Sequence, residues 1–340
     1  MRDGFKALAL AVALVATACG DGGGEAPGGP AGPVTVELVT WNVLHGGRFD
    51  RVTSAAPADI PRAIDEVWAE MEASDPAGRM RAVAAGIAAA RPDLVGLQEA
   101  ALWRSEPRDG SAAVAYDLAQ LVLDELRILG APYALAVVAA ASDATLPGAR
   151  AAYRFTDRDV ILAREGLAVS NPRSGRFDAG LQLPLPIPGG GSSRIPRAWT
   201  SVDVELDGGR FRFVSTHLET VEAVSTAQAA ELVDVAGSDL PVVLVGDFNS
   251  APGDPAYELL VSGPVGLRDA WEAGAGPGLT CCREQVDDPA AALTQRVDLI
   301  LHRGFTARTI ALLGAEAASF QAGHWPSDHA GVAATLELGP

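Results

Sequence analysis

Residues 241–250, with the sequence PVVLVGDFNS, constrain this chain more than any other segment. The apolar run 242–245 is β-branched at three of four positions and is typical of a buried parallel-type strand. Asp247 and Asn249 follow directly, at the edge where ligand sites of α/β proteins concentrate. Gly-Asp-x-Asn is also good turn chemistry, and taken alone this segment slightly favours a turn. The interpretation as a site depends on whether the pattern recurs.

The pattern does recur, because other predicted strands also begin or end in polar residues. These strands span residues 34–40, 94–97, 210–216, 297–301 and 332–338. With the central strand they supply hard oxygen and nitrogen donors: Asn42, Glu99, His217, Asp247, Asn249, Asp298, Asp328 and His329.

The remaining pattern alternates helices and strands without a short internal repeat. Residues between Gly47 and Pro76 are expected to be a polar insertion, and residues 184–197 an irregular loop, because of their Gly and Pro content. Apolar spacing predicts helices in residues 76–91, 115–129, 226–236 and 257–261. Further strands are expected at 133–139, 160–163, 199–205 and 306–313.

The donor types limit the chemistry. No Cys/His cluster has the spacing of a structural zinc site. Oxygen-rich ligation by carboxylates instead favours Mg²⁺, Mn²⁺ or Ca²⁺. No Gly-x-Ser-x-Gly motif is present, which argues against a serine hydrolase.

Six motifs together carry a family resemblance. TWN at 40–42, LQE at 97–99, STHLE at 215–219, GDFNS at 246–250, RVDLIL at 296–301 and SDH at 327–329 resemble, in this order, the endonuclease/exonuclease/phosphatase superfamily. The resemblance covers about residues 34–338 and implies a single-domain, four-layer α/β sandwich of two packed mixed sheets flanked by helices. It also implies metal-dependent hydrolysis of a phosphoester, most naturally a phosphodiester, with phosphomonoester cleavage as a competing reading. The implied substrates are nucleic acid, a phospholipid or an inositol phosphate.

The resemblance implies a metal site for Mg²⁺ or Mn²⁺. Glu99 resembles the main metal carboxylate, Asn42 a polar group near metal and phosphate, and Asp328 a residue beside the metal. One branch of the superfamily carries an acid two residues after this asparagine. This chain has Leu44 there, so a second metal ligand is not expected at that place.

The same resemblance implies catalytic roles. Asp247 looks like the residue that orients or deprotonates the attacking water, and Asn249 like a donor to a phosphate oxygen. His217 resembles the histidine that hydrogen-bonds the phosphate or serves the leaving group. Asp298 and His329 resemble the carboxylate–imidazole pair. Hydrolysis of a phosphodiester needs a Lewis acid, a positioned water and donors for the developing charge.

The other histidines and the paired cysteines leave alternatives open. His302 and His324 are expected to be structural, and His45 either reaches the site or lies on the surface. Cys281 and Cys282 form either a vicinal disulfide or two free thiols, two alternatives of about equal weight.

The N-terminus predicts export. Residues 1–18 combine Arg2 and Lys6 with an apolar run at 7–16, which is too short to span a bilayer and is typical of a signal peptide. Ala-Thr-Ala-Cys at 16–19 resembles a bacterial lipobox, so Cys19 is the predicted lipidation site and residues 19–33 a Gly/Pro-rich tether. We therefore expect an extracytoplasmic, membrane-anchored lipoprotein of the cell envelope, with simple secretion as the alternative.

The net charge bears on partners. It is −17, which argues against holding nucleic acid by broad phosphate neutralisation. It does not exclude hydrolysis of a phosphate through a bound cation, which inverts the local field. We expect a monomer without a stable nucleic-acid partner. The competing hypotheses are a binding protein on the same fold that has lost catalysis and a structural surface lipoprotein.

Overall fold

The computed structural model describes residues 33–184 and 192–339. The predicted signal segment 1–18, Cys19 and all of the tether except Pro33 lie outside the described residues. Within the part of the chain that is described, no helix has the length and apolar character needed to cross a membrane.

Two mixed sheets form the centre of the fold. The larger has the strand order β15-β16-β1-β2-β6-β3-β4, with β5 also paired to β6. Its strands are β1 (Thr35–Asn42), β2 (Leu94–Gln98), β3 (Leu102–Pro107), β4 (Val114–Asp117), β5 (Tyr133–Pro147), β6 (Ala151–Arg164), β15 (Phe305–Leu313) and β16 (Gly331–Leu338).

The smaller sheet has the order β13-β14-β12-β11-β10-β7. Its strands are β7 (Ala168–Arg176), β10 (Ala198–Leu206), β11 (Gly209–His217), β12 (Val242–Asp247), β13 (Arg268–Asp269) and β14 (Asp298–Arg303). A separate antiparallel pair joins β8 (Leu181–Pro184) to β9 (Ser192–Ile195).

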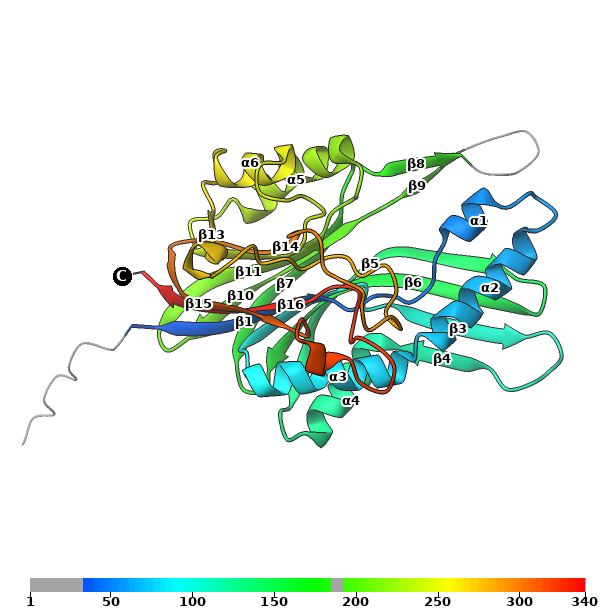
Figure 1. Ribbon diagram of the computed structural model, residues 1–340. Helices are drawn as coiled ribbons and strands as arrows, with labels where there is room; N and C mark the ends of the chain where they lie inside the picture. The colour runs from blue at the N-terminus through cyan, green and yellow to red at the C-terminus, as the bar shows by residue number, and fades with distance from the viewer. Residues whose placement is uncertain (1–32, 185–191, 340) are drawn as a thin grey trace, which may run out of the picture. The chain divides into compact units, whose positions relative to one another are not determined.

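Helices cover the outer face of each sheet (Figure 1). Helices α2, α3 and α4 pack on the larger sheet around Trp41 and Trp103, and α5 and α6 pack on the smaller sheet around Leu244. A third core, which includes Leu38 and Phe213, lies between the two sheets. The helices are α1 (Asp50–Ser54), α2 (Ile60–Ala73), α3 (Pro76–Ala90), α4 (Leu118–Ile128), α5 (Glu222–Ala236) and α6 (Pro255–Val261).

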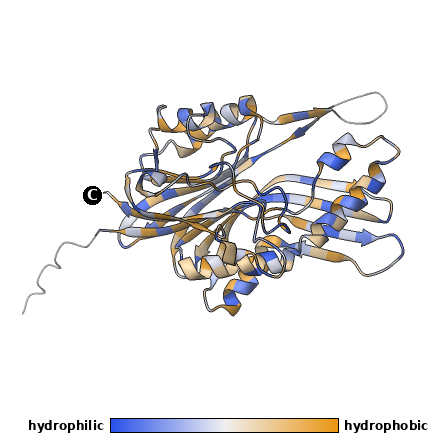
Figure 2. Ribbon diagram, in the orientation of Figure 1, coloured by the Kyte–Doolittle hydropathy of each residue, from blue (hydrophilic) through white to orange (hydrophobic). Residues whose placement is uncertain are grey.

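These layers confirm the predicted four-layer α/β sandwich. Strand β1 shows how the sequence produces it. Leu38 points into the core between the sheets, while Val39 and Trp41 point to the helices. A strand buried on both faces needs apolar residues at odd and even positions, and β1 has them. Hydrophobic colouring accordingly runs along the central strands, whereas outer helices such as α4 carry both kinds of residue (Figure 2).

The two sheets also meet through polar contacts near the functional end. The side-chain Nε2 of Gln98 donates to Ser215 Oγ across the interface at 3.0 Å. Gly96 permits this approach, because a Cβ there would stand 2.6 Å from Ser215 Oγ. Gly246 has φ +148°, and a Cβ there would collide with the backbone oxygen of Thr216. This glycine of the GDFNS motif therefore lets β12 lie against β11.

Several sequence predictions were incomplete. The supposed polar insertion contains α1 and the amphipathic helix α2, which buries Ile64, Val67 and Met71 at helical spacing. That spacing was a usable signal. The expected irregular loop at 184–197 is wrong in part, because Ser192–Ile195 forms β9, and residues 185–191 lie outside the described residues. The central strand β12 is parallel only to β11, since it pairs antiparallel with β14.

Candidate active site

Strand direction brings the predicted residues to one end of the sandwich. Strands β1 and β2 run parallel, as do β11 and β12, so their C-terminal ends lie together. Strand β14 runs antiparallel to β12, and its first residue, Asp298, pairs with the last, Asp247. Likewise β16 runs antiparallel to β1, so His329, just before β16, reaches the same end. Residues distant in sequence are therefore neighbours.

Asn42 connects two acids. Its Nδ2 donates to Glu99 Oε1 at 3.2 Å and to Asp247 Oδ2 at 3.0 Å. Its Oδ1 accepts the backbone N–H of Leu44 at 3.0 Å. This local bond turns the amide so that its NH₂ faces the carboxylates. The carboxyl ends of the two sheets are thus joined by one buried side chain.

His217 and Asn249 lie on the other side of Asp247. The Nε2 of His217 is 3.4 Å from Asp247 Oδ2 and 3.2 Å from Asn249 Nδ2. Arg197 Nη1, which can only donate, lies 3.2 Å from His217 Nδ1. Burial, together with the charge of Arg197, holds the pKa of His217 well below its usual value. The ring is therefore neutral, accepts at Nδ1 and carries its proton on Nε2.

The amide orientation of Asn249 is also fixed. Its Nδ2 donates to the backbone oxygen of Leu218 at 2.9 Å, while its backbone N–H donates to Asp247 Oδ1 at 2.9 Å. The N–H groups of Asn249, His217 and Asn42 thus converge around Asp247. Burial and the nearby charge of Asp298 raise the pKa of Asp247 to about 7.

Asp298 and His329 form a buried pair. The His329 Nδ1 and Asp298 Oδ2 are 2.8 Å apart, and the His329 Nε2 lies 3.8 Å from Asp247 Oδ2. Burial opposes the charged ring, but Asp298, Asp328 and Asp247 outweigh it and hold the pKa of His329 well above its usual value. The pair therefore carries a protonated imidazole with its Nε2 side directed to the site.

Glu99 and Asp328 supply hard oxygen donors. Burial raises the pKa of Glu99, but the charge and the backbone N–H of His45, together with the charge of Arg197, lower it below its usual range. Burial, with the charge of Glu99 as a smaller cause, raises the pKa of Asp328. An ionised carboxylate beside a second, half-buried acid fits a hard divalent cation, which would relieve this repulsion.

His45 lies in the site, which settles one open alternative. Its backbone N–H donates to Glu99 Oε2 at 2.8 Å, and its ring Nε2 is 3.6 Å from the same oxygen. The ring packs among Phe49, Trp103 and Phe155. His45 therefore fixes the orientation of the Glu99 carboxylate.

The two histidines expected to be structural lie elsewhere. His302 is buried in β14. His324 lines a cavity of about 370 Å³ that also has Leu44, Arg283 and Asp328 in its wall. This cavity opens beside the Asp328 side of the site.

Sequence reasoning missed a second polar group, which Arg197, just before β10, forms with acids of β6 and with Glu219, just after β11. Arg197 lies 3.7 Å from Asp157 Oδ2 and 3.5 Å from Glu219 Oε2, in addition to its contact with His217. Asp159, two residues along the same strand as Asp157, is buried, and burial raises its pKa well above the usual value. The motif Asp157-Arg158-Asp159 within an apolar strand was an available signal.

Strained backbone accompanies the site. Leu44, Glu99 and Asn249 adopt φ values of +56°, +55° and +45°, which non-glycine residues rarely do. Each lies within two residues of the C-terminal end of β1, β2 or β12. Such conformations persist when surrounding contacts over-determine them, and they concentrate at functional sites.

The sequence pattern, the layers and this site define an α/β sandwich with an acid–amide–imidazole centre at its strand ends. The chain matches the Endonuclease/Exonuclease/phosphatase family over residues 39–329. It therefore belongs to the endonuclease/exonuclease/phosphatase family, as its motifs predicted.

Solved structures support the same fold. A family member from Bacteroides thetaiotaomicron is 18% identical, with a TM-score of 0.57 over 91% of this chain and 99% of the other. The mannosyl-6-phosphatase of that organism is 18% identical, with a TM-score of 0.53 over 88% and 99%. Truncated TDP2 of Caenorhabditis elegans is 19% identical, with a TM-score of 0.52 over 89% and 97%. The comparison with curated proteins gave no significant match.

Proposed function

We propose that this protein is a divalent-metal-dependent hydrolase of a phosphoester bond, with a phosphodiester as the first choice of substrate. Membership in the endonuclease/exonuclease/phosphatase family supports phosphoester hydrolysis in general. The observation that carries the finer proposal is the convergence of oriented donors on one buried carboxylate, Asp247. A merely structural cluster would not need three N–H groups and an acid with a pKa near 7 at one place.

The proposed mechanism assigns the donors first. The Nε2–H of His217 and the second side-chain N–H of Asn249, whose first is held by Leu218, bind non-bridging oxygens of the phosphate and stabilise charge that develops on them. Asn42 keeps its N–H groups on Glu99 and Asp247 and holds these two carboxylates in place. Asp247 accepts a proton from the attacking water, because its pKa of about 7 matches that of an efficient general base. His329, held by Asp298, donates through Nε2 to the same phosphate.

The proposed cation site consists of Glu99 and Asp328. A bound Mg²⁺ or Mn²⁺ would supply Lewis-acid polarisation of a phosphate oxygen. Asn42, the third predicted ligand, faces this site with its NH₂ and orients Glu99. It would add its oxygen only after turning the amide away from Leu44.

The proposed substrates are nucleic acid, a phospholipid or an inositol phosphate. The net charge of −17 disfavours long anionic polymers held by charge alone. The cavity beside Asp328 has room for a substituent of the scissile phosphate. A sugar phosphate joins the candidates because one structural neighbour is a mannosyl-6-phosphatase.

A substrate panel tests this proposal. The purified protein is assayed with Mg²⁺ or Mn²⁺, with and without EDTA, on plasmid DNA, RNA, sphingomyelin, inositol phosphates, a sugar phosphate and an aryl phosphodiester. We expect cation-dependent hydrolysis of at least one substrate that is lost in Asp247→Asn. Binding without hydrolysis across the whole panel would instead identify a non-catalytic binding protein.

We further propose export and membrane attachment through an acylated Cys19. The support is the apolar run 7–16, the Ala-Thr-Ala-Cys sequence and the Gly/Pro-rich segment that follows. We also propose that the protein acts as a monomer; sedimentation or light scattering of the purified protein tests this.

A further inference from the structure

Soft donor atoms lie beside His329, and the proposed hydrolysis does not use them. A disulfide bond joins the adjacent residues Cys281 and Cys282. The Sγ of Cys282 is 3.9 Å from His329 Nε2. The two sulfurs and a ring nitrogen of His329 all lie within 4.8 Å of one another. Sulfur and imidazole donors are the ligands that zinc prefers, unlike the oxygen donors of Glu99 and Asp328.

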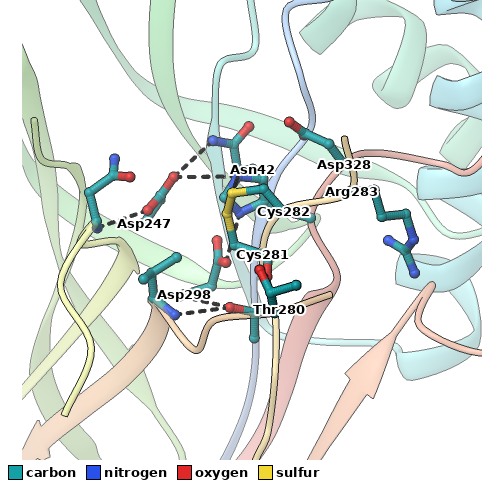
Figure 3. Close-up of a disulfide and its surroundings, with 12 residues drawn as sticks. Asn42, Asp247, Thr280, Cys281, Cys282, Arg283, Asp298 and Asp328 are labelled. Carbon is teal, nitrogen blue, oxygen red and sulfur yellow. Dashed lines mark hydrogen bonds and ion pairs between the residues drawn. A yellow bond between two sulfur atoms is a disulfide. The ribbon is translucent and has the colours of Figure 1, made fainter. Parts of the chain in front are cut away.

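Backbone hydrogen bonds attach this cysteine pair to the site on both sides. On one side, Thr280 Oγ1 accepts from the N–H of Asp298 at 3.0 Å, and Thr280 O accepts from Ala330 at 2.7 Å. On the other side, the N–H of Arg283 donates to Asp328 O at 2.9 Å. The disulfide therefore lies among the acids of the site (Figure 3). None of these bonds involves sulfur, so they do not depend on the S–S bond.

His329 is held in the way that metal-binding histidines are held. Metal-binding histidines usually give their second ring nitrogen to a carboxylate, as Nδ1 of His329 does to Asp298. The Nε2 is left facing Cys282 at 3.9 Å. In a tetrahedral zinc site, bond lengths of about 2.3 Å to sulfur and 2.0–2.1 Å to nitrogen place these two atoms about 3.6 Å apart. The observed separation needs only a small adjustment.

We propose that Cys281 and Cys282, once reduced, form with His329 a binding site for a thiophilic divalent cation such as Zn²⁺. In the disulfide form neither sulfur is a thiolate, so the site exists only after reduction. Cys282 is exposed and accessible to a reductant, whereas Cys281 is buried. Resting on the proposed function, we further infer that the bound cation takes His329 Nε2 away from the phosphate and stops hydrolysis.

The chemical step balances with a dithiol reductant. The dithiol supplies two electrons and two protons, the S–S bond breaks into two thiols, and the dithiol becomes a disulfide. Cation binding then releases the thiol protons and any proton on His329 Nε2 to solvent. The Nδ1 proton stays in the hydrogen bond to Asp298.

Cobalt spectroscopy on the full chain tests binding without any need for turnover. The protein is reduced with a dithiol, freed of it under anaerobic conditions, and titrated with Co²⁺ in excess Mg²⁺, which fills the oxygen site. We expect a thiolate-to-cobalt charge-transfer absorption that saturates at one ion per chain. Asp298→Asn should weaken the Co²⁺ affinity by about 10–100-fold, the usual effect of losing a carboxylate behind a ligating histidine.

Two controls isolate the paired cysteines. The oxidised parent protein needs no substitution and should show no absorption beyond that of Cys19. The double variant Cys281→Ser/Cys282→Ser retains Cys19, so any Co²⁺ held by Cys19 appears in both proteins. No absorption in the reduced parent, or equal absorption in the double variant, would overturn the proposal.

The effect on hydrolysis is measured separately. Zn²⁺ should inhibit the reduced parent at least about 10-fold more strongly than the double variant, which should retain parental activity in Mg²⁺ alone. If Zn²⁺ inhibits the two proteins equally, the cation does not inhibit through this site, but the Co²⁺ titration still shows whether the site binds a cation. If no substrate is hydrolysed at all, the proposed function fails, while the charge-transfer test still decides the cation site.

Discussion

The substitution Asp298→Asn removes one charge from the buried pair with His329 and nearly preserves side-chain volume. At the 2.8 Å separation of Nδ1 and Oδ2, two unit charges attract by about 6 kcal/mol at an effective dielectric of about 20. Desolvation of the buried ions offsets much of this. We therefore expect the free energy of unfolding to fall by about 3 kcal/mol, the lower end for breaking a buried ion pair.

The stability loss should depend on pH with a definite sign. Against the effect of burial, the charges of Asp298, Asp328 and Asp247 hold the pKa of His329 well above its usual value in the folded state. Such a group contributes stability that is fully present below its unfolded pKa and is lost as pH rises through the folded pKa. The difference between parent and variant should thus be largest at about pH 6 and should shrink above the raised pKa.

Catalysis should suffer more than stability. The Asn oxygen can still accept from Nδ1, but without the Asp298 charge the pKa of His329 falls and the ring carries less positive charge. We expect kcat to fall by about 100-fold or more, measured at a temperature where the variant stays folded. Asp239→Asn is a matched control, because Asp239 is exposed on the surface.

Two results would refute the reasoning. A folded Asp298→Asn protein with the parental rate would make the pair structural only. A stability loss that stays constant across pH would show that His329 is not charged in the folded state. Urea unfolding at several pH values and single-turnover kinetics supply both measurements.

Five further predictions concern the site, the buried Arg79 and the N-terminus. Glu99→Gln should raise the Mg²⁺ concentration needed for half-maximal activity. It should also abolish the stabilisation by Mg²⁺, which for the parent is about 2.7 kcal/mol at an Mg²⁺ concentration of 100 times Kd. If calorimetry shows that the variant binds Mg²⁺ as tightly as the parent, Glu99 is not the ligand. Activity of the parent should rise with pH through about 7 as Asp247 loses its proton. The folded pKa of Asp247 lies above its unfolded value, so its ionisation above pH 7 destabilises the folded parent. In urea unfolding without metal, Asp247→Asn should therefore be more stable than the parent above pH 7, and a less stable variant would contradict this. Arg79→Met should cost about 3 kcal/mol of stability, since the buried Arg79 donates to the backbone oxygens of Ser74, Val43 and Leu44. Intact-mass analysis of membrane-extracted protein should show a chain that begins at an acylated Cys19, and an unmodified chain beginning elsewhere would exclude it.

The amino-acid sequence alone determined the fold class and the chemical identity of most site residues. Apolar runs that end in a carboxylate, an amide or an imidazole are local features, as Asp247 and Asn249 show. Strand periodicity and motif order do not depend on knowing which strands are neighbours. The order of the six motifs carried the family resemblance, and the resemblance implied the sandwich; both were confirmed.

Only the tertiary structure decided which side chains meet. Asn42 and Asp247 are 205 residues apart and hydrogen-bond because β1 and β12 end at the same edge of the two sheets. Arg197 fixes the protonated nitrogen of His217, although in sequence it belonged to an expected loop. Cys282 lies beside His329 because Thr280 and Arg283 bind the backbone around the acids. Contacts between distant segments depend on sheet order and strand direction, and no local pattern of residues encodes either one.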